Sequence, residues 1–173
     1  PRENVHIPDG TISMDEVEAY CEQYEKNIRS HGGIDIQLLG IGRTGHIGFN
    51  EPGSWLSSTT RLVRLDALTR RDAQKDFDKE EDVPYRAITM GIQTIMQAKM
   101  IFLMGWGQHK ANILQEAIEG EITPVVPSSF LQKHENVRAH LDTAAAEKLT
   151  RFNAPWLVGM CNWNDDLVCK AVV

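Results

Sequence analysis

The 173-residue sequence contains no apolar run that approaches the roughly 20 residues needed to span a bilayer. Nothing in it resembles a signal peptide. It also lacks an excess of basic residues, since the formal net charge is -6 and the pI about 5.5. Neither nucleic acid nor a membrane is therefore expected as the main partner, although local basic residues can still bind an anionic ligand.

Cysteine is scarce and forms no recognisable framework. Cys21, Cys161 and Cys169 are odd in number, and they have the spacing of neither a disulfide scaffold nor a zinc site. The plain interpretation is reduced thiols in a cytoplasmic protein.

The remaining composition is that of an ordinary globular protein, with 42% hydrophobic and 24% charged residues and enough length for one core. The periodic pattern fades after Pro155, so residues 155–173 are predicted to form a tail or linker toward an absent segment. The chain opens on Pro1 and stops inside an apolar run at Val173, which favours a piece of a longer protein.

Helical and strand patterns alternate along the chain. Ser13 to Glu16 matches a capping box, and an apolar helical stripe follows it as far as the glycine pair at 32–33. An apolar strand is predicted at 34–39. Further predictions are strands at 99–104 and 137–141, and helices at 91–97 (capped by Thr89), 110–119 (ended by Gly120) and 144–149 (capped by Asp142). Residues 54–82 are predicted to be irregular with a short helix. This alternation predicts a parallel sheet.

The most informative stretch is LLGIGRTGHIGFNEPGS, residues 38–54, where an apolar strand is followed by glycines and then by polar residues. Ligands of open α/β sheets bind outside the carboxyl ends of the strands. Imidazole titrates near pH 6.5, so His46 can exchange protons at neutral pH, and a carboxylate such as Glu51 can hold its tautomer. No third residue completes a metal-ligand spacing, so no metal is predicted.

Basic residues further along the chain offer candidate anion contacts. Lys110 opens a helix directly after a strand and two glycines, where free backbone N–H groups favour an anion, although a solvated lysine explains it equally well. Arg61 and Arg64 could bind phosphate or could lie at the surface, and their alternation with apolar residues does not decide between these roles.

The segment GIGRTGHIGFNEPGSWLSSTTR resembles the signature of the glucosamine-6-phosphate deaminase family. The likeness continues through YRAITMG, GWGQHKA and the Glu119–Gly120 pair, and it covers roughly residues 12–150. It implies an α/β fold with an open, mostly parallel, Rossmann-like sheet and helices on both faces. Family elements that cradle phosphate and move the C2 proton would lie upstream of Pro1. Residues 1–154 are therefore predicted to be the C-terminal portion of the domain, with a sheet incomplete at its N-terminal side and no activity alone.

The resemblance implies that glucosamine 6-phosphate and water give fructose 6-phosphate and ammonia, without a metal or organic cofactor. His46 matches the histidine that shuttles a proton between the ring oxygen and the anomeric hydroxyl, and Glu51 matches the carboxylate that assists it. Lys110 matches the lysine that holds the substrate phosphate. Gly45 and Asn50, in the same signature, are predicted to contact the phosphorylated amino sugar.

Two positions depart from the family pattern. Thr44 stands where the family usually has an aspartate two residues before the histidine. A hydroxyl can orient imidazole but cannot offset its positive charge, so the proton relay is expected to depend on Glu51. Lys75 falls near a family arginine at the phosphate end, and it keeps the charge without the bidentate fork.

Regulated relatives are hexamers with an effector site at a subunit interface. Ser54 and Arg61 match parts of that site, and they are predicted effector or phosphate contacts within a homo-oligomer. Val63 occupies a position where a basic residue is expected, which argues against allosteric control. Some relatives continue into a second domain, to which the tail after Pro155 would lead.

Two other functions use the same residues. A 6-phosphogluconolactonase-like hydrolase would use His46 as a base for water. A non-catalytic sugar-phosphate sensor would bind without turnover; Thr44 fits this alternative, whereas the intact His46 and Glu51 favour an enzyme.

Overall fold

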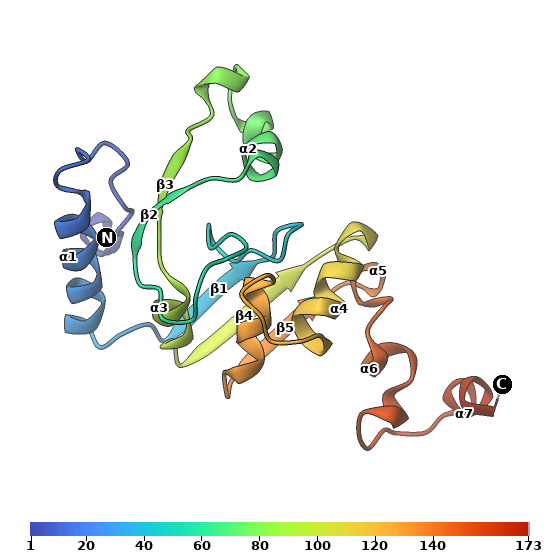
Figure 1. Cartoon of the computed structure of the whole chain (residues 1–173). Helices are drawn as coiled ribbons and strands as arrows, with labels where there is room; N and C mark the ends of the chain where they lie inside the picture. The colour runs from blue at the N-terminus through green and yellow to red at the C-terminus, as the bar shows by residue number, and fades with distance from the viewer. Residues whose placement is uncertain (173) are drawn as a thin grey trace.

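The computed structural model of the chain describes residues 1–172. A three-stranded parallel sheet of order β1–β4–β5 lies at its centre (Figure 1). Its strands are β1 (Ile36–Gly40), β4 (Met100–Gly105) and β5 (Val137–Leu141). Ile36 of β1 pairs with Met100, and Ile101 of β4 pairs with Val137. The predicted α/β fold with a mostly parallel sheet is thereby confirmed.

The two faces of the sheet have different surroundings. Leu39, Ile101 and Leu103 point into a buried core, which also takes apolar side chains from α3 (Ile92–Met96), α4 (Ala111–Glu119) and α5 (Thr143–Ala146). On the opposite face of β1, Ile36 and Leu38 are 58% and 60% exposed. Apolar side chains on a strand interior are normally covered, so this open face fits a sheet that is incomplete.

An antiparallel pair of strands stands apart from the main sheet. β2 (Arg61–Arg64) pairs with β3 (Arg86–Thr89), α2 (Ala67–Ala73) lies in the connection between them, and α1 (Val17–Ser30) packs beside β2. Figure 1 shows this hairpin and α2 rising above the sheet. The short helix expected within residues 54–82 is present, but the prediction was wrong for β2. Its four residues are half-buried or exposed and carry little apolar signal.

Two predicted helix caps were wrong. The Ser13 hydroxyl donates to the Glu16 carboxylate (2.7 Å), and α1 begins only at Val17 without a side-chain cap. Thr89 ends β3, and its hydroxyl accepts a hydrogen bond from the backbone N–H of Phe49 (3.1 Å).

The stop and the cap predicted around the later helices are confirmed. Gly120 follows the last residue of α4. Asp142 caps α5, because its carboxylate accepts a hydrogen bond from the Ala145 N–H at 2.8 Å. The 3-10 helices of the described residues are η1 (Arg2–Asn4), η2 (Gln74–Asp76), η3 (Glu80–Asp82), η4 (Gln108–Lys110), η5 (Pro127–Lys133) and η6 (Pro155–Leu157).

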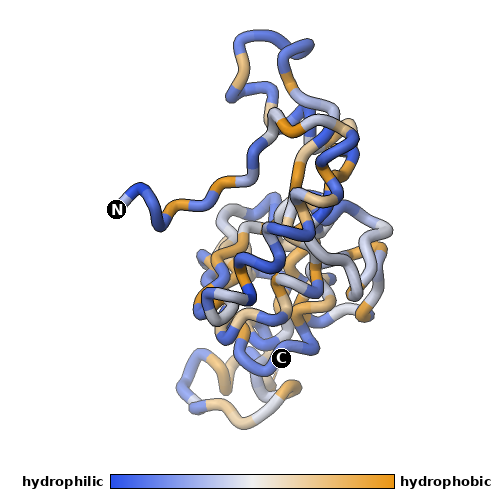
Figure 2. Tube along the Cα trace, turned by 90° about the vertical axis from the view of Figure 1, so that its left-hand side faces the viewer, coloured by the Kyte–Doolittle hydropathy of each residue, from blue (hydrophilic) through white to orange (hydrophobic). Residues whose placement is uncertain are grey.

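Both ends of the chain extend from the body of the molecule. Figure 2 shows the N-terminal arm leaving it, and Tyr24 of α1 anchors that arm by donating to the His6 carbonyl. At the other end, α6 (Thr150–Asn153) is followed by α7 (Asp165–Val172). The rings of Trp156 and Trp163 stack there, with 5.6 Å between their centroids. The division between residues 154 and 155 stays a prediction. Within residues 1–172, none of the helices is long and apolar enough to cross a membrane.

Candidate functional site

The loop after β1 owes its path to glycine. Gly45 has a φ of +77°, a left-handed conformation that side chains other than glycine rarely adopt. A Cβ at this position would lie 2.6 Å from Cγ1 of Val126. The Gly45 carbonyl also accepts a hydrogen bond from the Ser128 N–H at 2.9 Å, which ties the loop to η5.

The His46 ring rests on the backbone of Gly42. A Cβ at Gly42 would lie 2.0–2.3 Å from three atoms of the imidazole, so the ring occupies the space of the missing side chain. The Gly42 N–H donates to the His46 carbonyl at 2.9 Å, which closes the turn between them. The ring orientation is therefore set by its own loop.

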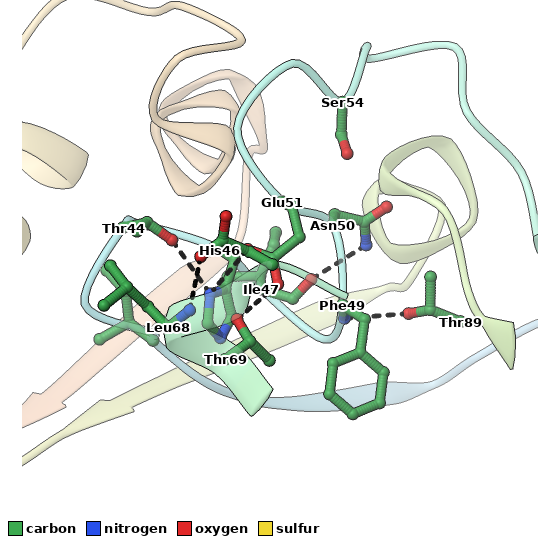
Figure 3. A network of polar contacts seen from close by, with 12 residues as sticks. Thr44, His46, Ile47, Phe49, Asn50, Glu51, Ser54, Leu68, Thr69 and Thr89 are labelled. Carbon is green, nitrogen blue, oxygen red and sulfur yellow. Dashed lines mark hydrogen bonds and ion pairs between the residues drawn. The ribbon is translucent and has the colours of Figure 1, made fainter. Parts of the chain in front are cut away.

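Two side chains meet Nδ1 of this imidazole (Figure 3). Oε2 of Glu51 lies 3.3 Å from Nδ1, and Oγ1 of Thr44 lies 3.1 Å from it. The side chains of His46 and Glu51 are 18% and 13% exposed, so little water screens the pair. The structure thus brings together the three residues predicted to be catalytic.

The second oxygen of Glu51 has a partner that sequence reasoning missed. Oγ1 of Thr69 in α2 donates to Oε1 at 2.5 Å. The two residues are 18 positions apart, and no local pattern marks Thr69 as a site residue. Gly42 was also missed as the support for the imidazole, although its place before the histidine in a glycine-rich loop was visible.

Asn50 is fully buried, and its amide is directed into the protein. Its Nδ2 donates to the carbonyls of Ile47 and Met90, both at 2.9 Å, and its Oδ1 accepts from Nη1 of Arg61 at 2.9 Å. These contacts fasten the loop to the end of β3. The predicted substrate contact of Asn50 stays a prediction, and the same holds for Gly45.

Arg61 joins Asn50 to Ser54. Its Nη2 donates to Oγ of Ser54 at 3.1 Å, and burial lowers the pKa of Arg61 from its ordinary value. Arg61 and Ser54 line an open cleft of about 490 Å³, together with Glu51, Trp55, Ser57, Ser58 and Arg64. The two predicted effector contacts therefore lie together, in a cleft that Glu51 also lines.

Lys110 reaches the same loop from the start of α4. Its Nζ donates to the Ile41 carbonyl at 2.8 Å. Burial lowers the pKa of Lys110; the carboxylate of Asp72 opposes this shift, and the guanidinium of Arg43 reinforces it. Arg43 and Asp72 form an ion pair between the loop and α2.

Lys75 lies on η2 beyond α2, where it is exposed. Throughout residues 1–172 its side chain takes part in no hydrogen bond or ion pair. Its predicted role at the phosphate end stays a prediction.

The arrangement supports proton transfer beside an anion contact. If Nδ1–H donates to the Glu51 carboxylate, the lone pair of Nε2 is left free to accept a proton. Lys110 adds a half-buried ammonium at the end of the same loop. In the described part of the chain, no group of three or more His, Cys, Asp and Glu side chains is arranged to hold a metal ion.

Comparisons with known proteins agree on the kind of protein. Residues 1–140 match the family described as glucosamine-6-phosphate isomerases/6-phosphogluconolactonase. The chain is 49% identical over 149 residues to a glucosamine-6-phosphate deaminase of Alkaliphilus oremlandii, with coverage of 86% of this chain and 61% of that protein. A solved monomeric glucosamine-6-phosphate deaminase superposes with a TM-score of 0.81 at 42% identity, covering 86% of this chain and 61% of that one.

A longer protein matches almost the whole chain. A glucosamine-6-phosphate deaminase-like protein of Bacteroides thetaiotaomicron is 49% identical over 172 residues, which are 99% of this chain and 26% of that protein. The chain spans about three-fifths of the length of the Alkaliphilus deaminase and a quarter of the Bacteroides protein.

Proposed function

Because the chain belongs to the glucosamine-6-phosphate isomerase/6-phosphogluconolactonase family, we propose that the full-length protein is a glucosamine-6-phosphate deaminase. It would convert glucosamine 6-phosphate and water to fructose 6-phosphate and ammonia. The observation that carries the proposal is the half-buried pair of His46 and Glu51 at the carboxyl end of β1. The identity to named deaminases supports this reaction over lactone hydrolysis.

His46 is the proton carrier in this proposal. It would take a proton from the anomeric hydroxyl of the bound sugar and return it to the ring oxygen, which opens the ring. The Glu51 carboxylate favours the tautomer with hydrogen on Nδ1, and it stabilises the imidazolium that forms during the transfer. The Thr44 hydroxyl, at 3.1 Å from Nδ1, helps to orient the ring but carries no compensating charge.

Lys110 is the phosphate contact in this proposal. An ammonium group has three donors, and the Ile41 carbonyl takes one of those on Nζ, so the others are available to a phosphate. Burial lowers the pKa of Lys110. A bound phosphate would raise this pKa again, because the opposite charge favours the ammonium form.

We further propose that residues 1–154 form the C-terminal portion of the deaminase domain. The chain covers 61% of the Alkaliphilus deaminase and 61% of the solved deaminase, which supports a partial domain. Substrate contacts from the remaining portion of the domain would complete the site, so activity is a property of the full-length protein. Residues 155–173 would lead toward a further segment, as the much longer Bacteroides relative suggests.

The test is substrate preference of the full-length protein. We expect ammonium and fructose 6-phosphate to appear in equal amounts from glucosamine 6-phosphate, with no acid release from 6-phosphogluconolactone. Lactone hydrolysis without ammonium would identify a lactonase that uses His46 as a base for water. Binding of glucosamine 6-phosphate without any product would identify a sensor.

A further inference from the structure

Helix α2 reaches the site through one buried side chain. The helix lies in the connection between β2 and β3, above the main sheet (Figure 1). Thr69, at 8% exposure, is its buried residue. Its hydroxyl donates to Oε1 of Glu51 at 2.5 Å, so a helix outside the sheet touches the carboxylate that faces His46.

We infer that Thr69 is a positioning residue for Glu51, an inference that rests on the proposed function. The carboxylate presents two different oxygens to two different partners. Thr69 binds Oε1, and this leaves Oε2 directed at Nδ1 of His46, 3.3 Å away. Within residues 1–172, Oε2 is buried and has no hydrogen bond beyond its 3.3 Å ion pair with His46, so the Thr69 hydrogen bond to Oε1 helps to hold the carboxylate in the orientation that faces the imidazole.

Local helix formation does not account for this contact. A helical threonine can direct its hydroxyl to a carbonyl three or four residues earlier, whereas Thr69 donates to a side chain 18 positions away. The start of α2 is already capped by Asp66, which accepts from the Leu68 N–H at 2.8 Å. The Thr69 hydroxyl is therefore not needed as a helix cap and can donate to Glu51.

The other tie between α2 and the loop is more exposed. Arg43 and Asp72 form an ion pair, but their side chains are 59% and 41% exposed. Exposed ion pairs contribute little because water and salt screen them. The buried link between α2 and the loop is the hydrogen bond from the Thr69 hydroxyl, so the position of α2 determines where the Glu51 carboxylate is held.

Loss of the hydroxyl should lower turnover without lowering affinity. Thr69→Val keeps the shape and the burial of the side chain but removes the donor. We expect kcat to fall about tenfold, the scale of one hydrogen bond to a charged group, with KM for the sugar phosphate nearly unchanged.

The experiment compares three variants of the full-length protein by the rate of ammonium release from glucosamine 6-phosphate at a range of substrate concentrations. Thr69→Val should show the fall in kcat at an unchanged KM, and Thr69→Ser, which keeps the hydroxyl, should restore kcat. Thr143→Val, at an exposed threonine of α5, is the matched control and should behave as wild type. Wild-type kcat for Thr69→Val, or equal impairment of Thr69→Val and Thr69→Ser, would overturn the inference.

Failure of the proposed function gives a different result. If the wild-type protein releases no ammonium, the deaminase proposal fails, and the Thr69 contact is then tested by the ¹⁵N chemical shift of Nδ1 in His46. We expect this shift to change in Thr69→Val and to remain as in wild type in Thr69→Ser. An unchanged shift in Thr69→Val would overturn the positioning role.

Discussion

Nδ1 of His46 lies 3.3 Å from Oε2 of Glu51, and the chain between them makes a turn at residues 47–50. Two features make this approach possible. Gly48, with a φ of +57°, allows the turn, and the Asn50 N–H closes it by donating to the Ile47 carbonyl at 3.1 Å. The pair is therefore a product of the loop backbone, and its supports can be tested one by one.

The first support is the missing side chain of Gly42. Gly42→Ala should displace the imidazole, because the added Cβ would fall 2.0–2.3 Å from three ring atoms. A shift of a catalytic group by about 1 Å can cost roughly 10²-fold in rate, and we expect a loss of that order in ammonium release. The matched control is Gly40→Ala, where a Cβ meets nothing within 4 Å in residues 1–172. NMR signals of the His46 ring should move in the first variant only; unmoved signals in Gly42→Ala would contradict this support.

The second support is the buried amide of Asn50. Asn50→Ala would remove three buried hydrogen bonds, the two that the amide donates to the carbonyls of Ile47 and Met90 and the one that it accepts from Arg61. We expect the free energy of unfolding to fall by about 3 kcal/mol, because three buried hydrogen bonds are lost and one of them is to a charged group. Urea denaturation measures this loss. Asn162→Ala, at an exposed position of the tail, should change stability little. Equal midpoints for the two variants would argue against a structural role for Asn50.

A third prediction concerns pH and the buried carboxylate of Glu25. Burial opposes its ionisation, but hydrogen bonds from the hydroxyl and N–H of Thr60 and from the hydroxyl of Thr94 outweigh this, with help from Arg29. The pKa of Glu25 is therefore held below its ordinary value near 4.5. A carboxylate with a lowered pKa stabilises the fold fully above its unfolded-state value, and this contribution disappears as pH falls through the folded-state value.

Glu25→Gln should therefore be less stable than wild type at pH 7, by about 1–2 kcal/mol for lost hydrogen bonds to a charged group. The difference should shrink as the pH falls below 4.5. Glu22→Gln, at an exposed position of α1, is the control and should follow wild type throughout. Thermal denaturation between pH 7 and pH 3 checks the trend. A difference that stays constant with pH would mean that the charge of Glu25 does not stabilise the fold.

Much of the central sheet could be predicted from sequence, because β1 and β4 are runs of apolar residues that lie beside turn signals. The apolar runs of β1 and β4 each lead into glycines, and both strands are present. The contact between His46 and Glu51 was also within reach, since it spans five positions of one loop. Short range and strong hydrophobic contrast made these features readable.

Contacts between distant segments were out of reach. Thr69 meets Glu51 across 18 positions, and Glu25 meets Thr94 across 69. Neither threonine carries a local signal, because its role depends on where another segment folds. β2 was missed for a related reason. Its four residues are half-buried or exposed and show little hydrophobic periodicity, so the strand is defined by its pairing with β3.

The proton-carrying role of His46 is the central claim, and turnover of His46→Gln in the full-length protein tests it most directly. Glutamine keeps polarity and size but cannot exchange a proton near neutral pH. We predict that binding of glucosamine 6-phosphate is retained, while ammonium release falls by roughly 10²-fold or more, the usual scale for a group that transfers protons. His109→Gln, at an exposed histidine of η4, should keep wild-type turnover. Near-normal ammonium release by His46→Gln would contradict the account and remove His46 from the mechanism.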